Sequence, residues 1–205
     1  MMRKAVVVAA MCAMCAAVFA GAPVELVNAG FEQTGKGGYP VGWSRHPNWH
    51  GERAGHNGSG GLVFECAKGE EQKKGRPQQL VKLEAGKRYY VSALVKATGI
   101  VTARNTAAQG VGLYLDCYGA DGKWKFGGGP RKFARGTTKD WMKVEFITRE
   151  VPEGIVRAYI QPWPKKCLSG RAVIDNIYVA EYDLPPVAGV LRSVTISVVF
   201  TRADT

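Results

Sequence analysis

Val173-Ile174-Asp175-Asn176-Ile177-Tyr178-Val179, near the C-terminal end of the chain, alternates apolar residues with polar or small ones. Near the N-terminal end, Leu26-Val27-Asn28-Ala29-Gly30-Phe31-Glu32 has the same character, and Pro40-Val41-Gly42-Trp43 follows it. A period of two is typical of a β-strand with one face in a core. Each stretch also carries an acid, Glu32 or Asp175, where a strand enters or leaves that core. The two stretches therefore predict strands near both ends of one β-domain.

Between these stretches the sequence consists of short alternating runs separated by Gly, Pro, Asn and Asp, with almost no helical periodicity. This pattern predicts an all-β fold of two packed antiparallel sheets. At 205 residues the chain is long enough for one well-buried domain with a tail. The predicted strands span residues 24–28, 42–46, 61–67, 77–83, 89–96, 111–118, 141–150, 156–163 and 172–182.

The alternation also sorts the two faces of each strand. Within 89–96 and 111–118 the odd-numbered residues should face the core, and within 156–163 the even-numbered ones, Val156, Ala158 and Ile160, should do so. The opposite faces of the last two strands are rich in aromatic, amide and charged side chains, which is unusual for a surface that only meets water. These outward residues include Tyr114, Asp116, Tyr118, Arg157, Tyr159, Gln161 and Trp163.

With the interior run 83–96, Leu-Glu-Ala-Gly-Lys-Arg-Tyr-Tyr-Val-Ser-Ala-Leu-Val-Lys, these motifs resemble those of galactose-binding-like β-sandwiches. The pattern is most similar to the carbohydrate-binding modules of families 4, 9 and 22, and it covers residues 24–182. The resemblance implies a two-sheet antiparallel jelly roll that binds a polysaccharide or glycan without catalysis. One departure is Leu94, at a position where relatives often carry an aromatic residue.

The resemblance also implies a structural Ca²⁺ ion that ties the first and last strands together. Its ligands in the family are the Glu of the Gly-Phe-Glu motif, an Asp of the last strand and backbone carbonyls, and Glu32 and Asp175 stand at the matching positions. Ca²⁺ prefers six to eight hard oxygen ligands, and the Gly-rich turn 56–61 could add carbonyls. In the alternative interpretation both acids lie at the surface as caps or in salt bridges.

A sugar ring has an apolar face and a rim of hydroxyls, so its site needs a flat aromatic platform with planar hydrogen-bonding groups beside it. Trp49, Trp124 and Trp163 lie in loops or at strand ends, where either ligand contact or local packing is possible. Trp43 and Trp141 are interpreted as structural. The predicted carbohydrate-binding residues are Trp49, Tyr114, Asp116, Trp124, Arg157, Tyr159, Gln161 and Trp163.

The sequence carries no serine-hydrolase elbow, phosphate loop or His-Glu-x-x-His motif. No pair of carboxylates stands out as the acid and base that a glycosidase needs. His46, His50 and His56 cluster in one loop-rich stretch, where a zinc site and an ordinary loop beside the sugar are the alternatives. We therefore expect no catalytic activity.

The N-terminal residues 1–20 have the features of a signal peptide, with Arg3 and Lys4 before an uncharged apolar run and Val18-Phe19-Ala20 as a cleavage site. The run is short for a membrane span, so we expect a secreted or periplasmic protein without one, cleaved near Ala20. After the module, 21–182, residues 183–189 have the composition of a linker. Residues 190–205 are either an added edge strand or the start of a second module, such as a catalytic domain in a longer homologous chain.

The net charge of +11 favours polyanions at low salt, although the basic residues are spread over several loops. No nucleic-acid motif is present, so nucleic acid is not an expected partner. After signal cleavage three cysteines remain, Cys66, Cys117 and Cys167, without metal or redox spacing. Besides a carbohydrate-binding module, the sequence allows a structural or adhesive spacer with a basic surface, or the targeting fragment of a larger glycoside hydrolase.

Overall fold

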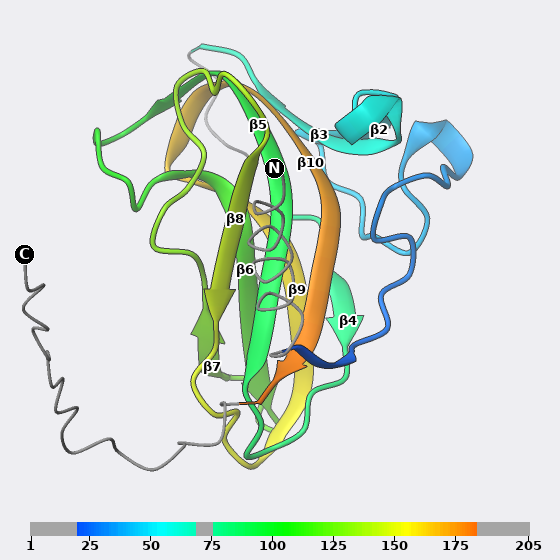
Figure 1. Ribbon diagram of the computed structural model, residues 1–205, viewed down its shortest axis with the longest axis vertical. Coiled ribbons are helices and arrows are strands. Elements are labelled where there is room, and N and C mark those ends of the chain that lie inside the picture. The colour runs from blue at the N-terminus through cyan, green and yellow to red at the C-terminus, as the bar shows by residue number, and fades with distance from the viewer. Residues whose placement is uncertain (1–19, 69–75, 184–205) are drawn as a thin grey trace, which may run out of the picture.

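The computed structural model describes residues 20–68 and 76–183 (Figure 1). The predicted signal peptide up to residue 19, the tail 190–205 and nearly all of the predicted linker lie outside this part. The described residues form ten strands and two short 3₁₀ turns, η1 (Lys36–Gly38) and η2 (His56–Gly58), without an α-helix. The strands are β1 (Ala20–Pro23), β2 (Trp49–Glu52), β3 (Gly61–Cys66), β4 (Gln79–Val81), β5 (Tyr89–Thr102), β6 (Gly110–Gly119), β7 (Trp124–Gly128), β8 (Met142–Ile147), β9 (Ile155–Lys165) and β10 (Cys167–Tyr182).

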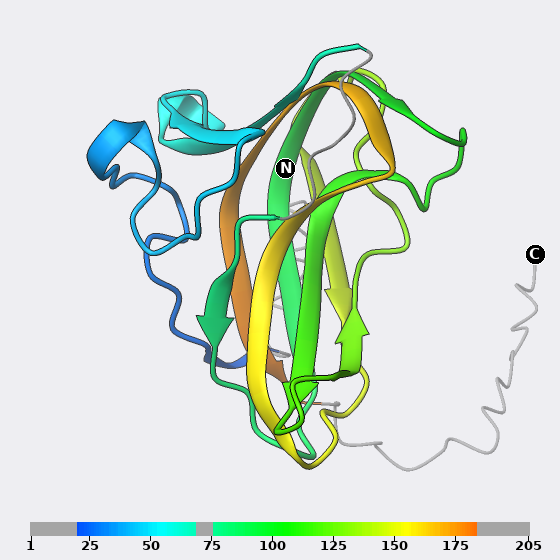
Figure 2. The same cartoon turned by 180° about the vertical axis from the view of Figure 1, so that it is seen from behind.

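The strands build two antiparallel sheets that pack face to face. The first has the order β2-β3-β10-β5-β8 with β1 beside β10, and it is the front layer in Figure 1. The second has the order β4-β9-β6-β7 and is the front layer in Figure 2. The predicted all-β, two-sheet antiparallel sandwich is confirmed. Because β1 pairs with β10, both ends of the described chain lie along the same strand.

The core between the sheets is filled by the apolar residues that the alternation predicts. Val91, Ala93 and Val95 of β5 are buried against Leu113 and Leu115 of β6 in one apolar cluster. Burying an aliphatic side chain of this size contributes about 1.5–3 kcal/mol, so the apolar set fixes which face points inward. The alternate residues of the same strands must then point outward, which is how the fold positions a surface site.

Two predicted strands are wrong, and each has a local cause. Residues 24–28 are not a strand, because Asn28 and Phe31 adopt left-handed backbone angles, with φ of 53° and 56°, that interrupt an extended chain. Residues 42–46 are irregular, because the chain turns at Val41 and Gly42, whose φ is 83°. The sequence analysis does not predict strands β1, β2 and β7.

One residue of β9 faces opposite to its prediction. Val156 was expected in the core, but it is 56% exposed. The pairing of β9 with β6 shifts between Tyr118 and Gly119, so Gly119 stands opposite Ile155 and Tyr118 opposite Arg157. Ile155 packs against the core instead. From Ala158 and Ile160 onward the predicted inward face is correct.

The three cysteines of the described part, Cys66, Cys117 and Cys167, are buried. Burial raises the pKa of Cys117 to about 12, and burial followed by the neighbouring Cys66 raises the pKa of Cys167 to about 12. A thiol that keeps its proton at neutral pH is a poor nucleophile, so these residues act as small apolar side chains. Within residues 20–68 and 76–183 no helix has the length and apolar character to cross a bilayer.

Candidate functional site

The outward side chains of β6 and β9 meet on one face of the four-stranded sheet. In the antiparallel register Tyr118 stands opposite Arg157, Asp116 opposite Tyr159, and Tyr114 opposite Gln161. Directly opposed residues point to the same side of a sheet. Seven of the eight predicted binding residues therefore share this surface with Tyr118, and we call it the aromatic face. Its members are Tyr114, Asp116, Tyr118, Trp124, Arg157, Tyr159, Gln161 and Trp163.

The aromatic face is long and open. Along β6 it extends from Tyr118 to Gly112, which stands opposite Trp163, a distance of about 20 Å at the usual rise per residue. The neighbouring strands widen it, because Trp124 of β7 stands beside Tyr118 and Leu80 of β4 stands beside Tyr159. This is an elongated surface suited to an extended ligand.

Asp116 is the polar anchor of the aromatic face. The residue is only 6% exposed, and its Oδ1 accepts a hydrogen bond of 2.9 Å from the indole Nε1 of Trp124. Its Oδ2 accepts a hydrogen bond from the amide Nε2 of Gln161, and an Arg76 nitrogen lies 3.9 Å away. Because both carboxylate oxygens already have partners, Asp116 orients the side chains around it and offers little to a ligand. Gln161, 3% exposed, has the same internal role.

Trp124 is the most exposed aromatic ring of this face, at 53%. Its only polar atom is bonded to Asp116, so the remaining exposed surface is an apolar ring held at a fixed angle. Gly127 makes room for this arrangement. A Cβ on Gly127 would lie 2.6 Å from the Leu115 carbonyl oxygen and 3.0 Å from the Trp124 Nε1. Gly127, near the end of β7, is thus required for Trp124 to pack in this position.

A second aromatic group lies at the opposite end of the face. Tyr114 and Trp163 meet edge to face with centroids 4.4 Å apart and an interplanar angle of 89°. The guanidinium of Arg76 stacks 4.3 Å above the Trp163 ring, and Lys165 lies 5.6 Å from it. Such cation–π contacts fix the ring but cover part of its surface. Trp163 is therefore half-buried and less open than Trp124.

Trp49 does not lie on the aromatic face. It is 3% exposed in the core, where its ring packs 5.1 Å from that of Phe64. Strand β2 pairs with β3 so that Trp49 stands opposite Phe64, which the loop-like sequence around it did not indicate. A ring without an exposed face cannot stack on a sugar, and the predicted ligand contact of Trp49 is wrong. Trp43 is structural as expected, 6% exposed and packed against Phe31.

The histidine cluster shows no metal geometry. His50 lies 3.5 Å from Glu52, and the His56 ring meets that of Trp141 at a right angle with centroids 5.7 Å apart. Across the described ranges no three or more His, Cys, Asp or Glu side chains are grouped to hold a metal ion. Leu94 pairs with Asp175 and Lys143 in the six-stranded sheet. Its departure from the family pattern therefore does not affect the aromatic face.

Glu32 and Asp175 converge beside the middle of β10, next to the point where its pairing with β3 ends. A Cβ on Gly30 would lie 3.8 Å from Asn176 Oδ1 and 3.9 Å from both Asp175 Oδ1 and Glu32 Oε1, so three side-chain oxygens approach one point. Asp175 is completely buried; its Oδ2 accepts a hydrogen bond of 2.8 Å from the His56 amide, and its Oδ1 accepts one of 2.6 Å from the Asn176 amide. Among the described residues no Lys or Arg nitrogen lies within 4 Å of either carboxylate.

The Gly-rich turn 56–61 packs against Glu32 and Asp175 and hydrogen-bonds to both carboxylates. The amide of Gly60 donates to both oxygens of Glu32 at 3.2 and 3.1 Å, and Ser59 Oγ donates to Asp175 at 2.8 Å. Gly60 needs its missing side chain, since a Cβ there would lie 2.2 Å from the Phe31 carbonyl oxygen. The turn, the N-terminal segment and β10 are thereby joined at one place.

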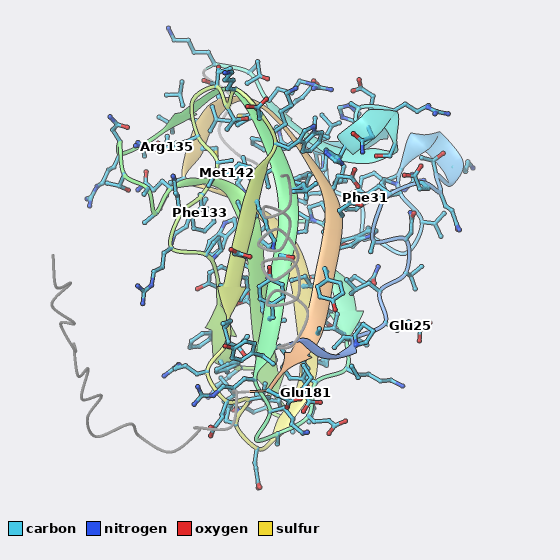
Figure 3. All side chains as sticks on the ribbon, in the orientation of Figure 1. Glu25, Phe31, Phe133, Arg135, Met142 and Glu181 are labelled. Atoms are coloured by element: carbon cyan, nitrogen blue, oxygen red, sulfur yellow. The ribbon has the colours of Figure 1, made fainter. Side chains whose placement is uncertain are left out.

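A separate hollow of about 470 Å³ lies where the N-terminal segment approaches β4 and β10. Glu25 and Glu181 line it, and Figure 3 shows both near the same end of the sandwich. Its aromatic residue, Tyr89, is buried, and its hydroxyl oxygen accepts a hydrogen bond of 2.8 Å from the backbone amide of Glu84. This hollow offers no exposed ring on which a ligand could stack.

Comparison with other proteins identifies the fold. No family model matches the chain, and no curated protein matches it in sequence. Among solved structures, a family 22 xylan-binding module from Paenibacillus barcinonensis matches 81% of this chain over 99% of its own length, with 12% identity and a TM-score of 0.54. A family 4 carbohydrate-binding module matches 77% of this chain over 99% of its own length, with 14% identity and a TM-score of 0.50.

The same fold occurs in an enzyme-associated structure. The enzymatically active domain of tailspike protein 4 from bacteriophage CBA120 matches 76% of this chain over 21% of its own length, with 12% identity and a TM-score of 0.51. At these identities the likeness concerns the fold alone. The chain thus has the β-sandwich fold of carbohydrate-binding modules of families 22 and 4, as its motifs predicted.

Proposed function

We propose that this protein is a non-catalytic carbohydrate-binding module that binds a polysaccharide on its aromatic face. The observation that carries the proposal is Trp124, whose ring is 53% exposed while its nitrogen is bonded to the buried Asp116. An exposed indole held in a fixed orientation is costly to leave in water and is ready to stack on an apolar surface. The fold shared with the family 22 and family 4 modules supports this assignment.

The rest of the face supplies what a sugar chain requires. Tyr118 and Tyr159 lie in a T-shaped pair with centroids 6.0 Å apart, beside Trp124 along the strand register. Their rings extend the platform and their hydroxyls can hydrogen-bond to a sugar rim. The site is shallow, so a few stacking contacts must offset desolvation and ordering, and we expect weak binding.

The acidic residues of the aromatic face support the proposal that this module is non-catalytic. Within β4, β6, β7 and β9, Asp116 is the only acidic residue, and both of its oxygens have internal partners. Glycosidases use two carboxylates on either side of the scissile bond. The aromatic face therefore offers contacts for holding a sugar chain without a pair of groups to cleave it.

We also propose that Glu32 and Asp175 hold a structural Ca²⁺ ion. The residues fit this ion, because the convergent donors are all oxygens and the buried Asp175 has no cationic partner among the described residues. Asn176 Oδ1 and backbone carbonyls of the turn would complete the shell. A bound cation would neutralise the buried charge and join the N-terminal segment to β10, away from the aromatic face.

The chain organisation proposed here is a signal peptide in residues 1–20, one binding module in 21–182, a linker and the run 190–205. The proposal rests on Arg3, Lys4 and the apolar segment after them, and it implies a secreted or periplasmic protein. Mass spectrometry of the exported protein would test it, and a mature N-terminus near Gly21 is expected.

Affinity gel electrophoresis tests the proposed function. The protein is run through gels containing neutral or acidic polysaccharides, at low salt and at about 0.5 M salt, where charge attraction is largely screened. Retardation that survives high salt and disappears in Trp124→Ala is the expected result. Retardation by acidic polymers alone, abolished by salt and unchanged in Trp124→Ala, would instead indicate the adhesive alternative. No retardation by any polymer would refute sugar binding.

A further inference from the structure

The charges of the aromatic face do not balance. Arg76, Arg157 and Lys165 contribute three positive charges around this surface, against the single carboxylate of Asp116. That carboxylate is buried and already accepts hydrogen bonds from Trp124 and Gln161. The exposed part of the face is therefore positively charged, and a negatively charged ligand would be attracted to it.

Arg157 is the cation best placed to contact such a ligand. Its side chain is exposed, and no carboxylate oxygen among the described residues lies within 4 Å of its guanidinium. It lines a cavity of about 230 Å³ together with Gln78, Tyr118, Gly122 and Tyr159. The guanidinium thus stands at the edge of a small polar hollow without an internal counter-charge.

The walls of this cavity supply hydrogen-bond donors. Burial raises the pKa of Tyr118, so its hydroxyl keeps its proton at neutral pH. The side-chain amide of Gln78, just before β4, and the hydroxyl of Tyr159 in β9 can also donate. Gly122 lies in the β6–β7 turn with a φ of 71°, and a Cβ added there would lie 3.7 Å from a guanidinium nitrogen of Arg157, so the turn borders the cavity.

The cavity is continuous with the stacking platform. Across the sheet, Trp124, Tyr118 and Arg157 form one row, and Tyr159 belongs to the next row. A sugar chain lying on Trp124 and Tyr159 would thereby bring its substituents to the guanidinium. A planar carboxylate matches the two parallel donors of an arginine better than a hydroxyl does.

We propose that the Arg157 cavity binds the carboxylate of a uronic acid residue, so that the ligand is an acidic polysaccharide. This inference rests on the proposed function of the aromatic face and adds the class of polymer that it selects. The rings of the chain stack on Trp124 and Tyr159, while the carboxylate pairs with Arg157 and accepts from the phenol of Tyr118.

The experiment compares polymers that differ only in the carboxylate. Glucuronoxylan, polygalacturonate and alginate, each beside its carboxyl-reduced counterpart, are titrated into the protein by calorimetry at about 0.15 M and about 0.5 M salt. At least one acidic polymer should bind, and its carboxyl reduction should weaken binding about tenfold or more, the usual worth of a charge-assisted hydrogen bond.

Three variants assign that preference to the cavity. Arg157→Gln should bind the acidic polymer about tenfold more weakly than the unchanged protein does. It should bind the carboxyl-reduced polymer with the same affinity as the unchanged protein. Arg157→Lys keeps the charge but not the paired donors, so it should recover only part of the loss. Lys96→Gln, which removes one charge from an exposed residue of the other sheet, should bind unchanged. Circular dichroism confirms that each variant is folded.

The outcomes separate this inference from the proposed function. If reduced and acidic polymers bind equally and Arg157→Gln has no effect, the uronate inference is refuted while sugar binding stands. If Lys96→Gln weakens binding as much as Arg157→Gln does, the attraction is diffuse and the inference is also refuted. If no polymer binds, acidic or reduced, both the inference and the proposed function are wrong.

Discussion

Replacing Trp124 by alanine should weaken polysaccharide binding about fifteenfold without unfolding the protein. The ring is 53% exposed, which leaves about 130 Å² of a tryptophan's roughly 250 Å² open to a ligand. A sugar that stacks on one ring face covers about half of this area. At about 25 cal/mol per Å², the lost contact corresponds to about 1.6 kcal/mol, or about fifteenfold in Kd.

Calorimetric titration with the tightest-binding polymer measures this change, beside thermal unfolding of each variant. Trp124→Phe keeps an aromatic surface and should lose less than Trp124→Ala. Tyr178→Ala is the matched control, because Tyr178 is 39% exposed on β10 in the other sheet and should leave binding unaltered. Equal affinity of Trp124→Ala and the unchanged protein would refute the stacking argument, as would an equal loss in the Tyr178 control.

Three further predictions concern other parts of the fold. Gly127→Ala, whose new Cβ would lie 2.6 Å from a backbone oxygen, should weaken polymer binding in the same titration, whereas Gly35→Ala, with its nearest contact at 3.6 Å, should not; equal effects would contradict the packing argument. When Ca²⁺ is present at about a hundred times its Kd, its removal by a chelator should lower the Tm of the unchanged protein by about 5–10 °C. The same chelation should lower the Tm of Glu32→Gln less. A Tm that chelation leaves unchanged in both proteins would contradict the calcium proposal. Glu145 accepts hydrogen bonds from Tyr90 and Lys143, which lower its pKa below 4.5, so its contribution to folding stability is present above that pH and is lost as the pH falls through the lowered pKa. Between about pH 5 and about pH 3, the Tm of Glu145→Gln should therefore fall less than the Tm of the unchanged protein. Parallel curves of Tm against pH would contradict this.

The faces of the central strands were predictable because their pattern is local. In β6 every second residue is apolar and buried, so Tyr114 and Asp116 had to point outward once the core formed. The start of β9 was not predictable in the same way. The shift in pairing beside Tyr118 turns Val156 outward, and such a shift depends on the partner strand and not on the sequence of β9.

The features of the candidate site that the sequence does not predict depend on contacts between residues that are far apart in the chain. Trp49 looked like a loop residue, and only its pairing opposite Phe64 places it in the core. The sequence indicates only that basic residues occur in loops, whereas the position of Arg76 over Trp163 follows from tertiary packing. The role of Asp116 as an anchor was likewise hidden, because the sequence does not show that Trp124 reaches its carboxylate.

The most direct test of the central claim is a nuclear magnetic resonance titration that follows the indole N–H signals. The bound polysaccharide should shift the signal of Trp124, with a smaller effect on Trp163, and leave those of the buried Trp43 and Trp49 in place. Shifts of this kind would locate the ligand on the aromatic face. A ligand that binds while the Trp124 signal stays unchanged would contradict the account.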